Sequence, residues 1–330
     1  MNTRQNLEKR EHEILSPFAV FSDSAKRQRM EEKCKLRTEF QRDRDRIIHS
    51  KAFRRLKHKT QVFISPENDH FRTRLTHTLE VAQIARTIAR ALALNEDLTE
   101  AIALGHDLGH TPFGHSGEEV LNRICPYEFH HRLHSLRVVD VLEKEGGLNL
   151  TDEVRDGIAN HSGEGKASTL EGKIVSFADR IAYINHDIDD AIRGGFLNEN
   201  DIPREFYEVL GKTHAARINN LIMAIVSESD GRNTIEMEKT VHAAMLKLRE
   251  FMFANVYKSS VARAGEADSV AIIEDLYNFY LNSPSEIPER NKLLSQSDDL
   301  HRIVCDYIAS MTDLYATEIH RRLFKGEIYA

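Results

Sequence analysis

The sequence predicts an all-α fold. Only seven of its 330 residues are proline and sixteen are glycine, so few positions interrupt a helix. Apolar residues recur at steps of three and four over long stretches, a spacing that places them on one face of a helix. We find no strand-like alternation apart from a short hairpin considered near Gln61–Phe71. We therefore expect a core formed by helices packed on helices.

The predicted helices follow one another with few interruptions. An amphipathic helix is expected at about 75–94, and a second follows an N-cap at Asn95 and runs into His106 and Asp107. A third is expected at about 170–192, where Gly194 and Gly195 end it. Further helices are expected at about 203–229, 233–257, 267–281 and 297–324, with a loop at Ser283–Pro288.

Composition argues against several classes of protein. No apolar run approaches the length of a membrane span, and the first residues lack the apolar segment of a signal peptide, so we expect a cytoplasmic protein with no membrane partner. Three cysteines, Cys34, Cys125 and Cys305, lie far apart without metal-ligand spacing, and we expect them to be reduced and structural. The formal net charge of −7 favours solubility and indicates no particular partner.

The segment 26–59 is strongly basic. It holds fourteen Lys or Arg residues against five Asp or Glu. One interpretation is a solvated helix face laced with opposite charges, as the alternation at Arg42–Arg46 suggests. The other is a surface that faces the phosphates of nucleotides or of a nucleic-acid backbone. Composition alone does not separate the two interpretations.

Functional chemistry concentrates in the stretch Leu104–Glu118. This stretch contains three histidines and two carboxylates, namely His106, Asp107, His110, His115 and Glu118. A neutral imidazole beside a carboxylate is typical of a site that binds a divalent metal ion, because a buried charge is costly unless it is paired or ligating. The adjacent pair of His106 and Asp107 therefore predicts half of a metal site.

Two further ligands must come from other helices. A metal hydrolase needs three or four protein ligands and at least one position for water or substrate. His77 lies near the start of the first long predicted helix, and Asp179 interrupts the apolar pattern of the third. An ion pair between Asp179 and Arg180 or a neighbouring helix is the alternative explanation for that carboxylate.

These residues and their neighbours resemble a known family. The order of His77, His106, Asp107 and Asp179 is similar to the metal site of the HD-domain phosphohydrolase superfamily. The longer segments that resemble the bacterial dGTPase-like family of deoxynucleoside triphosphate triphosphohydrolases are Arg46–Phe63, Asp69–Glu80 and Asp179–Asp187. The resemblance runs from about residue 20 to 195 and continues more weakly to the C-terminus.

The resemblance implies a domain organisation. We expect an HD-domain helical core with appended C-terminal helices. The expected parts are a basic N-terminal helical segment at 1–60 that packs on the core, a metal-binding phosphohydrolase core at 61–200 and a C-terminal helical subdomain at 201–330.

The resemblance also implies a reaction. The expected activity is hydrolysis of a dNTP (dGTP-type) at the α-phosphorus, which releases a deoxynucleoside and inorganic triphosphate. By similarity, His115 and Glu118 form the catalytic pair and His131 lies close to the phosphates. A His and a Glu three residues apart share one helical turn, so the carboxylate can orient the imidazole. The sequence leaves open whether His115 acts as acid, base or nucleophile.

Positive side chains are needed near a triphosphate. Arg74 lies three residues before His77, on the same helical face, and could reach a metal-bound phosphate. Arg54, Lys57 and Lys59 could neutralise the rest of the triphosphate, which favours the phosphate-facing interpretation of the basic segment. His110 could hydrogen-bond substrate or support a metal ligand, and the sequence does not choose between these roles.

In the family, the residues equivalent to Tyr183 and Asp187 approach the deoxyribose. Gln61 occupies a position that resembles a family contact to the base or to the edge of the sugar. An aromatic ring where a 2′-hydroxyl would lie excludes ribonucleotides by its bulk, and an acid can hold the 3′-hydroxyl. The alternatives are that Tyr183 belongs to the core, that Asp187 is solvated and that Gln61 is a turn residue.

The sequence departs from the family pattern after Phe129. The family reads His-Asn-x-Gln-Ser where this chain has His131-Arg132-Leu133-His134-Ser135. The change puts secondary catalytic contacts in doubt, but not the metal site. A further polar pair, Asn160 and His161, also matches the family, with helix capping or support of a ligand as its default role.

The metal and the partners follow from the same resemblance. Two histidines and two aspartates suit a divalent ion, which could be Mg, Mn, Co, Ni, Fe or Zn. We expect a dNTP substrate and a homo-oligomer, and we consider a regulatory dNTP and single-stranded DNA as further partners. The alternatives are an HD phosphohydrolase that acts on a monophosphate, cyclic dinucleotide or alarmone, and a protein that senses dNTPs or binds single-stranded DNA.

Overall fold

The structure is a computed structural model that describes residues 2–61, 72–257, 266–297 and 299–326. Over these ranges the chain is helix, turn and loop, and its only β pairings are isolated bridges between Arg27 and Thr151 and between Thr60 and Thr73. The all-α prediction is therefore confirmed. The hairpin considered near Gln61–Phe71 lies outside the described residues except for Gln61. No described helix is both long and apolar enough to cross a membrane.

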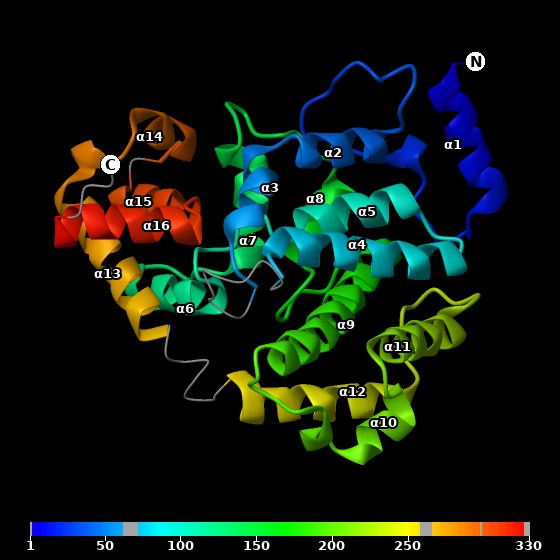
Figure 1. Ribbon diagram of the computed structural model, residues 1–330. Coiled ribbons are helices and arrows are strands. Elements are labelled where there is room, and N and C mark those ends of the chain that lie inside the picture. The colour runs from blue at the N-terminus through cyan, green and yellow to red at the C-terminus, as the bar shows by residue number, and fades with distance from the viewer. Residues whose placement is uncertain (1, 62–71, 258–265, 298, 327–330) are drawn as a thin grey trace.

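Figure 1 shows the helices in their spatial order. In chain order they are α1 (Thr3–Ile14), α2 (Glu39–Ile48), α3 (Lys51–Arg55), α4 (Arg74–Ala91), α5 (Glu96–Gly105), α6 (Gly114–Ile124), α7 (His131–Arg137), α8 (Asp152–Ala159), α9 (Leu170–Arg193), α10 (Arg204–Leu210), α11 (His214–Ser229), α12 (Lys239–Met252), α13 (Glu266–Asn282), α14 (Glu289–Ser295), α15 (Leu300–Ala309) and α16 (Asp313–His320). A π-helical turn, η3 (Val138–Leu142), continues α7.

The three helices expected to carry the metal ligands form close to their predicted bounds, as α4, α5 and α9. Each begins at an N-cap residue whose side chain accepts a backbone N–H of the first turn. These N-cap residues are Thr73 for α4, Asn95 for α5 and Thr169 for α9. The α9 helix stops at Gly194, followed by Gly195 with a φ of 73°. That left-handed backbone favours glycine, so this stop follows directly from the sequence.

Two of the long helices expected downstream are each divided. The prediction of a single helix at 203–229 is wrong. Gly211 has a φ of 100° and separates α10 from α11, whose N-cap is Thr213. The helix predicted at 297–324 is also divided, because Thr312 caps a new helix, α16, after α15 has ended.

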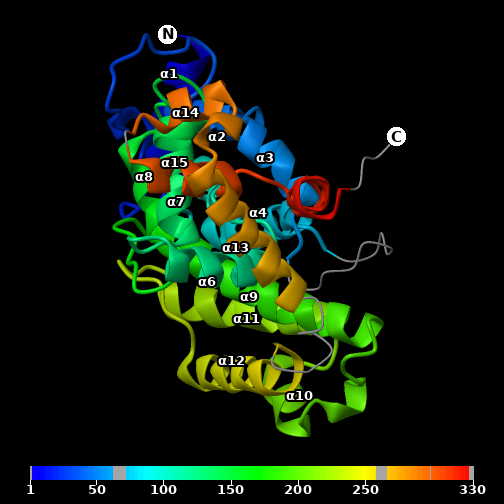
Figure 2. The same cartoon turned by 90° about the vertical axis from the view of Figure 1, so that its left-hand side faces the viewer.

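The buried apolar side chains form two clusters. The larger lies among α2, α4, α5, α8 and α9 and extends through α10–α12. The smaller joins α6 to α13, α15 and α16, and Figure 2 shows α13 crossing α6 on this side of the molecule. A disulfide connects Cys125, which follows α6, to Cys305 on α15. The expectation of reduced cysteines is therefore wrong for this pair, while Cys34 is free.

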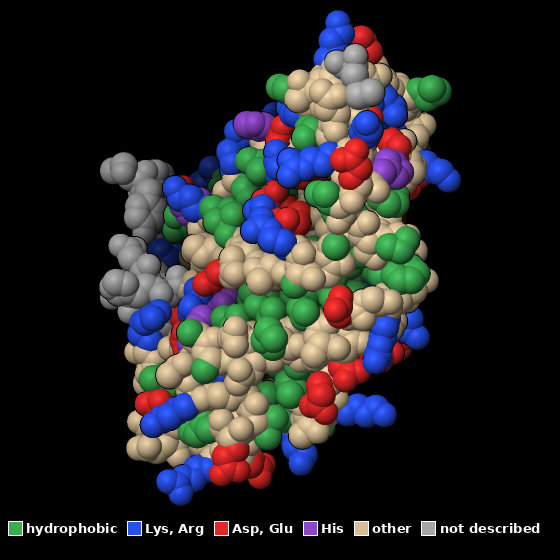
Figure 3. Space-filling model, turned by 90° about the vertical axis from the view of Figure 1, so that its right-hand side faces the viewer, with side chains coloured by type: hydrophobic (Ala, Val, Ile, Leu, Met, Phe, Trp, Pro, Cys, Tyr) green, Lys and Arg blue, Asp and Glu red, His purple; other side chains and the backbone are tan. Residues whose placement is uncertain are grey.

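Several arginines of the basic segment form ion pairs with carboxylates. Arg27 contacts Glu39 and Asp43 at 2.6 Å each. The other arginines between residues 37 and 46 that pair with carboxylates are Arg37, Arg42, Arg44 and Arg46. These five arginines fit the charge-laced interpretation better than the phosphate-facing one, although the ion pairs of Arg27 are buried rather than solvated. Figure 3 likewise shows basic and acidic side chains interspersed on the face it presents.

Lys59 does not face a phosphate. Its side chain is buried, and its Nζ donates to the carbonyl oxygens of His110 and Ala309, the latter at 2.8 Å. The expected role of Lys59 in neutralising a triphosphate is therefore wrong. This lysine instead connects the turn that follows α5 to the end of α15.

Replacing Lys59 by methionine is expected to remove a pH dependence of stability. Burial, followed by the charge of Arg55, lowers the pKa of Lys59 to about 7. An unfolded lysine titrates near pH 10.4, so between pH 7 and roughly 10 the unfolded chain binds more protons and the free energy of unfolding rises with pH. In urea unfolding, the free energy of unfolding of the wild type minus that of Lys59→Met should grow by about 1.4 kcal/mol per pH unit within that window. A difference that stays constant from pH 7.5 to 9.5 would contradict the neutral lysine.

Candidate metal and catalytic centre

Four side chains expected to bind metal converge from three segments. His77 lies in the first turn of α4, His106 and Asp107 directly follow α5, and Asp179 lies in the middle of α9. The Nε2 atom of His77 is 3.1 Å from Oδ1 of Asp179. The Nε2 atom of His106 is 3.9 Å from Oδ1 of both Asp107 and Asp179.

The geometry of His106 fits a metal ligand. Its Nδ1 lies 2.7 Å from the carbonyl oxygen of Ala103, which places the proton on Nδ1 and leaves the lone pair on Nε2. That Nε2 is buried and has no hydrogen-bond partner within the described structure. Ligands that stand about 2.1 Å from one ion lie roughly 3–4 Å apart. Ligand atoms of His77, His106 and Asp107 lie within 4.8 Å of one another, and Oδ1 of Asp179 lies 3.1 Å from His77 and 3.9 Å from His106, so their nitrogen and oxygen chemistry suits a divalent cation.

The electrostatics keep the two carboxyl groups ionised. Burial raises the pKa of Asp107, but the charge of Arg74 and the neighbouring histidines outweigh it and hold that pKa well below its usual range. Burial is likewise outweighed at Asp179, where the hydrogen bond to His77 lowers the pKa. A metal ligand must be deprotonated, so the environment prepares both oxygens for a cation.

Arg74 supports a ligand. Its side chain is buried, and Nη1 donates to Oδ2 of Asp107 at 2.7 Å. Nη2 lies 3.4 Å from the backbone oxygen of Gln61, which brings that residue near the same arginine. Arg54, by contrast, is exposed at the end of the short helix α3.

A second cluster surrounds Glu118 on α6. Oε2 of Glu118 is 2.8 Å from Nδ1 of His131, 3.6 Å from Nδ1 of His115 and 3.8 Å from Nε2 of His110. The backbone N–H of His131 also donates to this carboxylate, at 2.8 Å. Burial raises the pKa of Glu118, but its hydrogen bonds to His115 and His131 outweigh this and keep the group ionised. The side chain of His115 is 78% exposed, whereas His110 is buried.

His161, expected with Asn160 to cap a helix or support a ligand, joins the two clusters. Its Nε2 lies 3.2 Å from Nε2 of His131, and its ring centre is 4.9 Å from that of His106. Burial, followed by the charges of His106 and His131, lowers its pKa to about 3, so this imidazole is neutral. The available signal was the polar pair with Asn160, but sequence could not show that the turn after α8 reaches the centre.

A close backbone approach fixes the turn that carries the ligands. A Cβ atom on Gly109 would lie 2.1 Å from the backbone nitrogen of Ser135, so only glycine allows α7 to pack here. The hydroxyl of Ser135 accepts from the N–H of Gly109 at 2.9 Å and donates to the carbonyl oxygen of His106 at 2.7 Å. Ser135 therefore holds this turn in shape.

The residues that depart from the family pattern contact other parts of the chain. Arg132 donates to the carbonyl oxygen of Ala159 at 2.9 Å, and Leu133 is exposed. His134 packs against Phe129, and burial lowers its pKa to about 4. His131 still lies beside Glu118. The departure therefore changes residues that surround the centre more than the side chains expected to react.

The residues expected near the sugar share a helix with Asp179. Tyr183 and Asp187 follow at steps of four on α9. Tyr183 is half-buried, and burial raises its pKa to about 12, while Asp187 is buried. The helix thus carries a metal-ligand candidate, an aromatic ring and an acid along one face.

The comparisons with known proteins agree with this geometry. The model of the HD domain matches residues 74–184, and that of the phosphohydrolase-associated domain matches residues 235–322. A relative from Caldanaerobacter subterraneus subsp. tengcongensis, described as a deoxyguanosinetriphosphate triphosphohydrolase-like protein, is 56% identical over 98% of this chain and 96% of its own. Relatives with the same description from Desulfatibacillum aliphaticivorans and Clostridium tetani are 50% and 46% identical, covering 98% and 99% of this chain and 98% of theirs.

These identities extend over nearly the whole chain, and the matched HD domain contains all four residues of the candidate metal site. The chain therefore belongs to the deoxyguanosinetriphosphate triphosphohydrolase-like family of HD-domain phosphohydrolases.

Proposed function

We propose that this protein hydrolyses deoxynucleoside triphosphates at the α-phosphorus and releases a deoxynucleoside and inorganic triphosphate. The observation that carries the proposal is the contact between the two clusters. Ligand atoms of Asp107, His110 and His131 all lie within 4.8 Å of one another, so groups able to hold a cation adjoin groups able to move a proton. That combination suits the cleavage of a phosphate ester.

The metal site and the phosphates belong together in this proposal. A divalent ion held by His77, His106, Asp107 and Asp179 would polarise the phosphoryl oxygens. Arg74 keeps Asp107 ionised and oriented through its 2.7 Å hydrogen bond. The Nε atom of Arg74 is buried without a hydrogen-bond partner among the described residues, and in this proposal it donates to a phosphate oxygen.

The cluster around Glu118 is proposed to carry out the proton transfer. Glu118 orients His131 and His115 through their Nδ1 atoms, which leaves Nε2 of His115 directed to its exposed side. In the proposed reaction, His115 delivers a proton to the leaving 5′-oxygen. His110 and the neutral His161 pack beside His131 on the inner side of this cluster.

Tyr183 is proposed to select deoxyribose by its bulk. Replacing it by alanine should raise kcat/KM for ribonucleotides relative to deoxynucleotides by about 10- to 200-fold, the range expected when a small steric clash is relieved. Phenylalanine at the same position keeps the ring and should leave the preference unchanged. Competition between dGTP and GTP measures the ratio, and equal selectivity in Tyr183→Ala and wild type would contradict the steric role.

Product identification tests the activity itself. The purified protein is incubated with each dNTP and, separately, Mg, Mn, Co, Ni, Fe or Zn, and the products are separated by anion-exchange chromatography. Deoxynucleoside with intact triphosphate supports the proposal. Monophosphate with pyrophosphate, or diphosphate with phosphate, contradicts it. Turnover of a cyclic dinucleotide or alarmone alone would favour the other substrates of HD phosphohydrolases, and salt-dependent DNA binding without turnover would favour a binding protein.

A further inference from the structure

A cavity of about 130 Å³ lies outside the proposed catalytic centre, between α3, α7 with η3, and α14 with α15. Figure 1 shows α3 and α7 at the middle of the molecule, beside the C-terminal helices. Its wall includes three cationic side chains, Lys51, Arg55 and Arg290. It also includes Leu108, the residue directly after Asp107, so the cavity reaches the turn that carries the metal-ligand candidates.

The two guanidinium groups of this cavity form no direct ion pair with the described residues, although the charge of Glu143 acts on Arg55. Arg55 is half-buried, and neither Arg55 nor Arg290 makes a hydrogen bond or ion pair with the described part of the chain. Burial lowers the pKa of Arg55, the charge of Glu143 opposes this, and the nearby charge of Arg290 lowers it further. Two like charges that share a partly enclosed space are unfavourable unless an anion neutralises them.

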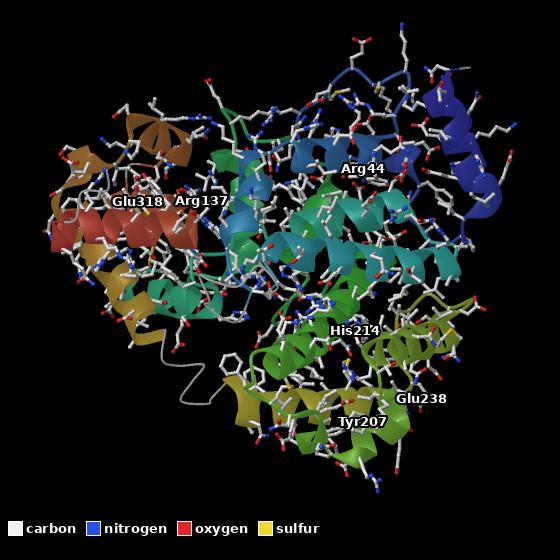
Figure 4. The ribbon with its side chains drawn as sticks, viewed as in Figure 1. Arg44, Arg137, Tyr207, His214, Glu238 and Glu318 are labelled. Atoms are coloured by element: carbon white, nitrogen blue, oxygen red, sulfur yellow. A yellow bond between two sulfur atoms is a disulfide. The ribbon has the colours of Figure 1, made fainter. Side chains whose placement is uncertain are left out.

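The acids in the wall are already engaged. The carboxylate of Glu143 accepts the backbone N–H groups of Lys51, at 2.8 Å, and Ala52. Asp306 accepts from Nη2 of Arg137 at 2.6 Å and from the hydroxyl of Ser295 at 2.6 Å. Figure 4 shows Arg137 in the region between α7 and the C-terminal helices. The described lining therefore carries three cationic side chains against two carboxylates, one of which, Asp306, is already paired with Arg137.

We propose that this cavity is a binding site for a phosphate-type oxyanion, held by Arg55 and Arg290 with Lys51 at its edge. A guanidinium presents paired N–H donors that match phosphate oxygens, and two of them can each bind two oxygens. The volume suits one or two linked phosphates and leaves a sugar or base outside the cavity. The anion is inorganic phosphate or polyphosphate, or the phosphate end of a nucleotide.

Occupation of the site would connect two parts of the molecule. Arg55 belongs to α3 and Arg290 to α14, so one anion would replace the repulsion between them by a shared partner. Ala309 and Leu108 also line the cavity, and Lys59 already connects the carbonyl oxygens of Ala309 and His110. Binding is therefore expected to stabilise the packing of the C-terminal helices against the ligand-bearing turn.

Calorimetric titration with pyrophosphate tests the site. The full chain is used in excess EDTA, so that no divalent ion recruits phosphate to the metal centre. Arg290→Gln and Arg55→Gln should each weaken pyrophosphate binding by about tenfold, as expected for the loss of a charge-assisted hydrogen-bonding group. Lys292→Gln is the matched control, because it removes a partly exposed positive charge, paired with Glu289, from the same helix, α14, and lies outside the cavity. It should bind as the wild type does.

The possible outcomes distinguish an inorganic phosphate from a nucleotide as the ligand, and they include the results that overturn the proposal. Similar affinities for pyrophosphate, triphosphate and dNTPs indicate that inorganic phosphates suffice, whereas dNTP binding more than tenfold tighter indicates a nucleotide. No measurable pyrophosphate binding, or equal binding by Arg55→Gln, Arg290→Gln and the wild type, overturns the proposal. Since Arg290 is exposed, its variant is expected to fold even if Arg55→Gln does not. These results do not depend on whether the protein hydrolyses dNTPs.

Discussion

Replacement of Asp179 by asparagine is expected to abolish tight metal binding and to lower the turnover of dNTPs by about 10³-fold or more, which corresponds to about 4 kcal/mol of transition-state stabilisation. Oδ1 of Asp179 lies 3.1 Å from Nε2 of His77 and 3.9 Å from Nε2 of His106, so it contributes the negative charge shared by both imidazoles. The amide keeps the shape of the side chain but removes its charge.

Metal content and turnover should be measured on the same samples. Asp268→Ala is the control, because Asp268 is an exposed acid in the first turn of α13, far along the chain from the centre. It should keep the metal and the rate, while circular dichroism should show that Asp179→Asn remains helical. Full turnover by Asp179→Asn in the presence of EDTA would remove the metal site from the mechanism.

Replacement of Glu118 by glutamine is expected to lower kcat by about 10²- to 10⁴-fold, the usual contribution of general acid–base catalysis, without loss of metal. The carboxylate holds His131 at 2.8 Å and lies 3.6 Å from Nδ1 of His115. A neutral amide loses the negative charge that favours the protonated forms of these rings and accepts hydrogen bonds more weakly.

Glu119→Gln provides a matched comparison, since Glu119 is the next residue on α6 and its side chain is exposed. Steady-state kinetics should show an unchanged kcat for this control. If Glu118→Gln instead raises KM and leaves kcat intact, then the carboxylate contributes to binding and the catalytic assignment is wrong.

The fold could be predicted because it depends on local periodicity. The apolar spacing, together with the caps at Thr73, Asn95 and Thr169, determines α4, α5 and α9 to within a few residues. The division at Gly211 could not be read in the same way, because a glycine within an apolar pattern adopts a left-handed backbone only when its neighbours pack to favour it. Tertiary contacts also decide the pairing of Cys125 with Cys305.

The candidate metal ligands could be found because they violate the apolar pattern. A carboxylate at Asp179, within a stripe of Ile, Phe and Ala, has few structural explanations. The environments of Lys59 and His161 could not be read from the sequence, for the opposite reason. Both are ordinary in sequence, and only the packing of distant helices shows that Lys59 connects two carbonyl groups and that His161 lies between the clusters.

Isotope labelling tests the central claim most directly, because it identifies the bond that breaks. The protein is given dGTP and an activating divalent ion in water enriched in ¹⁸O, and the products are analysed by mass spectrometry. Attack at the α-phosphorus with the 5′-oxygen as leaving group predicts one ¹⁸O atom in the inorganic triphosphate and none in the deoxynucleoside. Label in the deoxynucleoside, or in a monophosphate or phosphate product, would contradict the account.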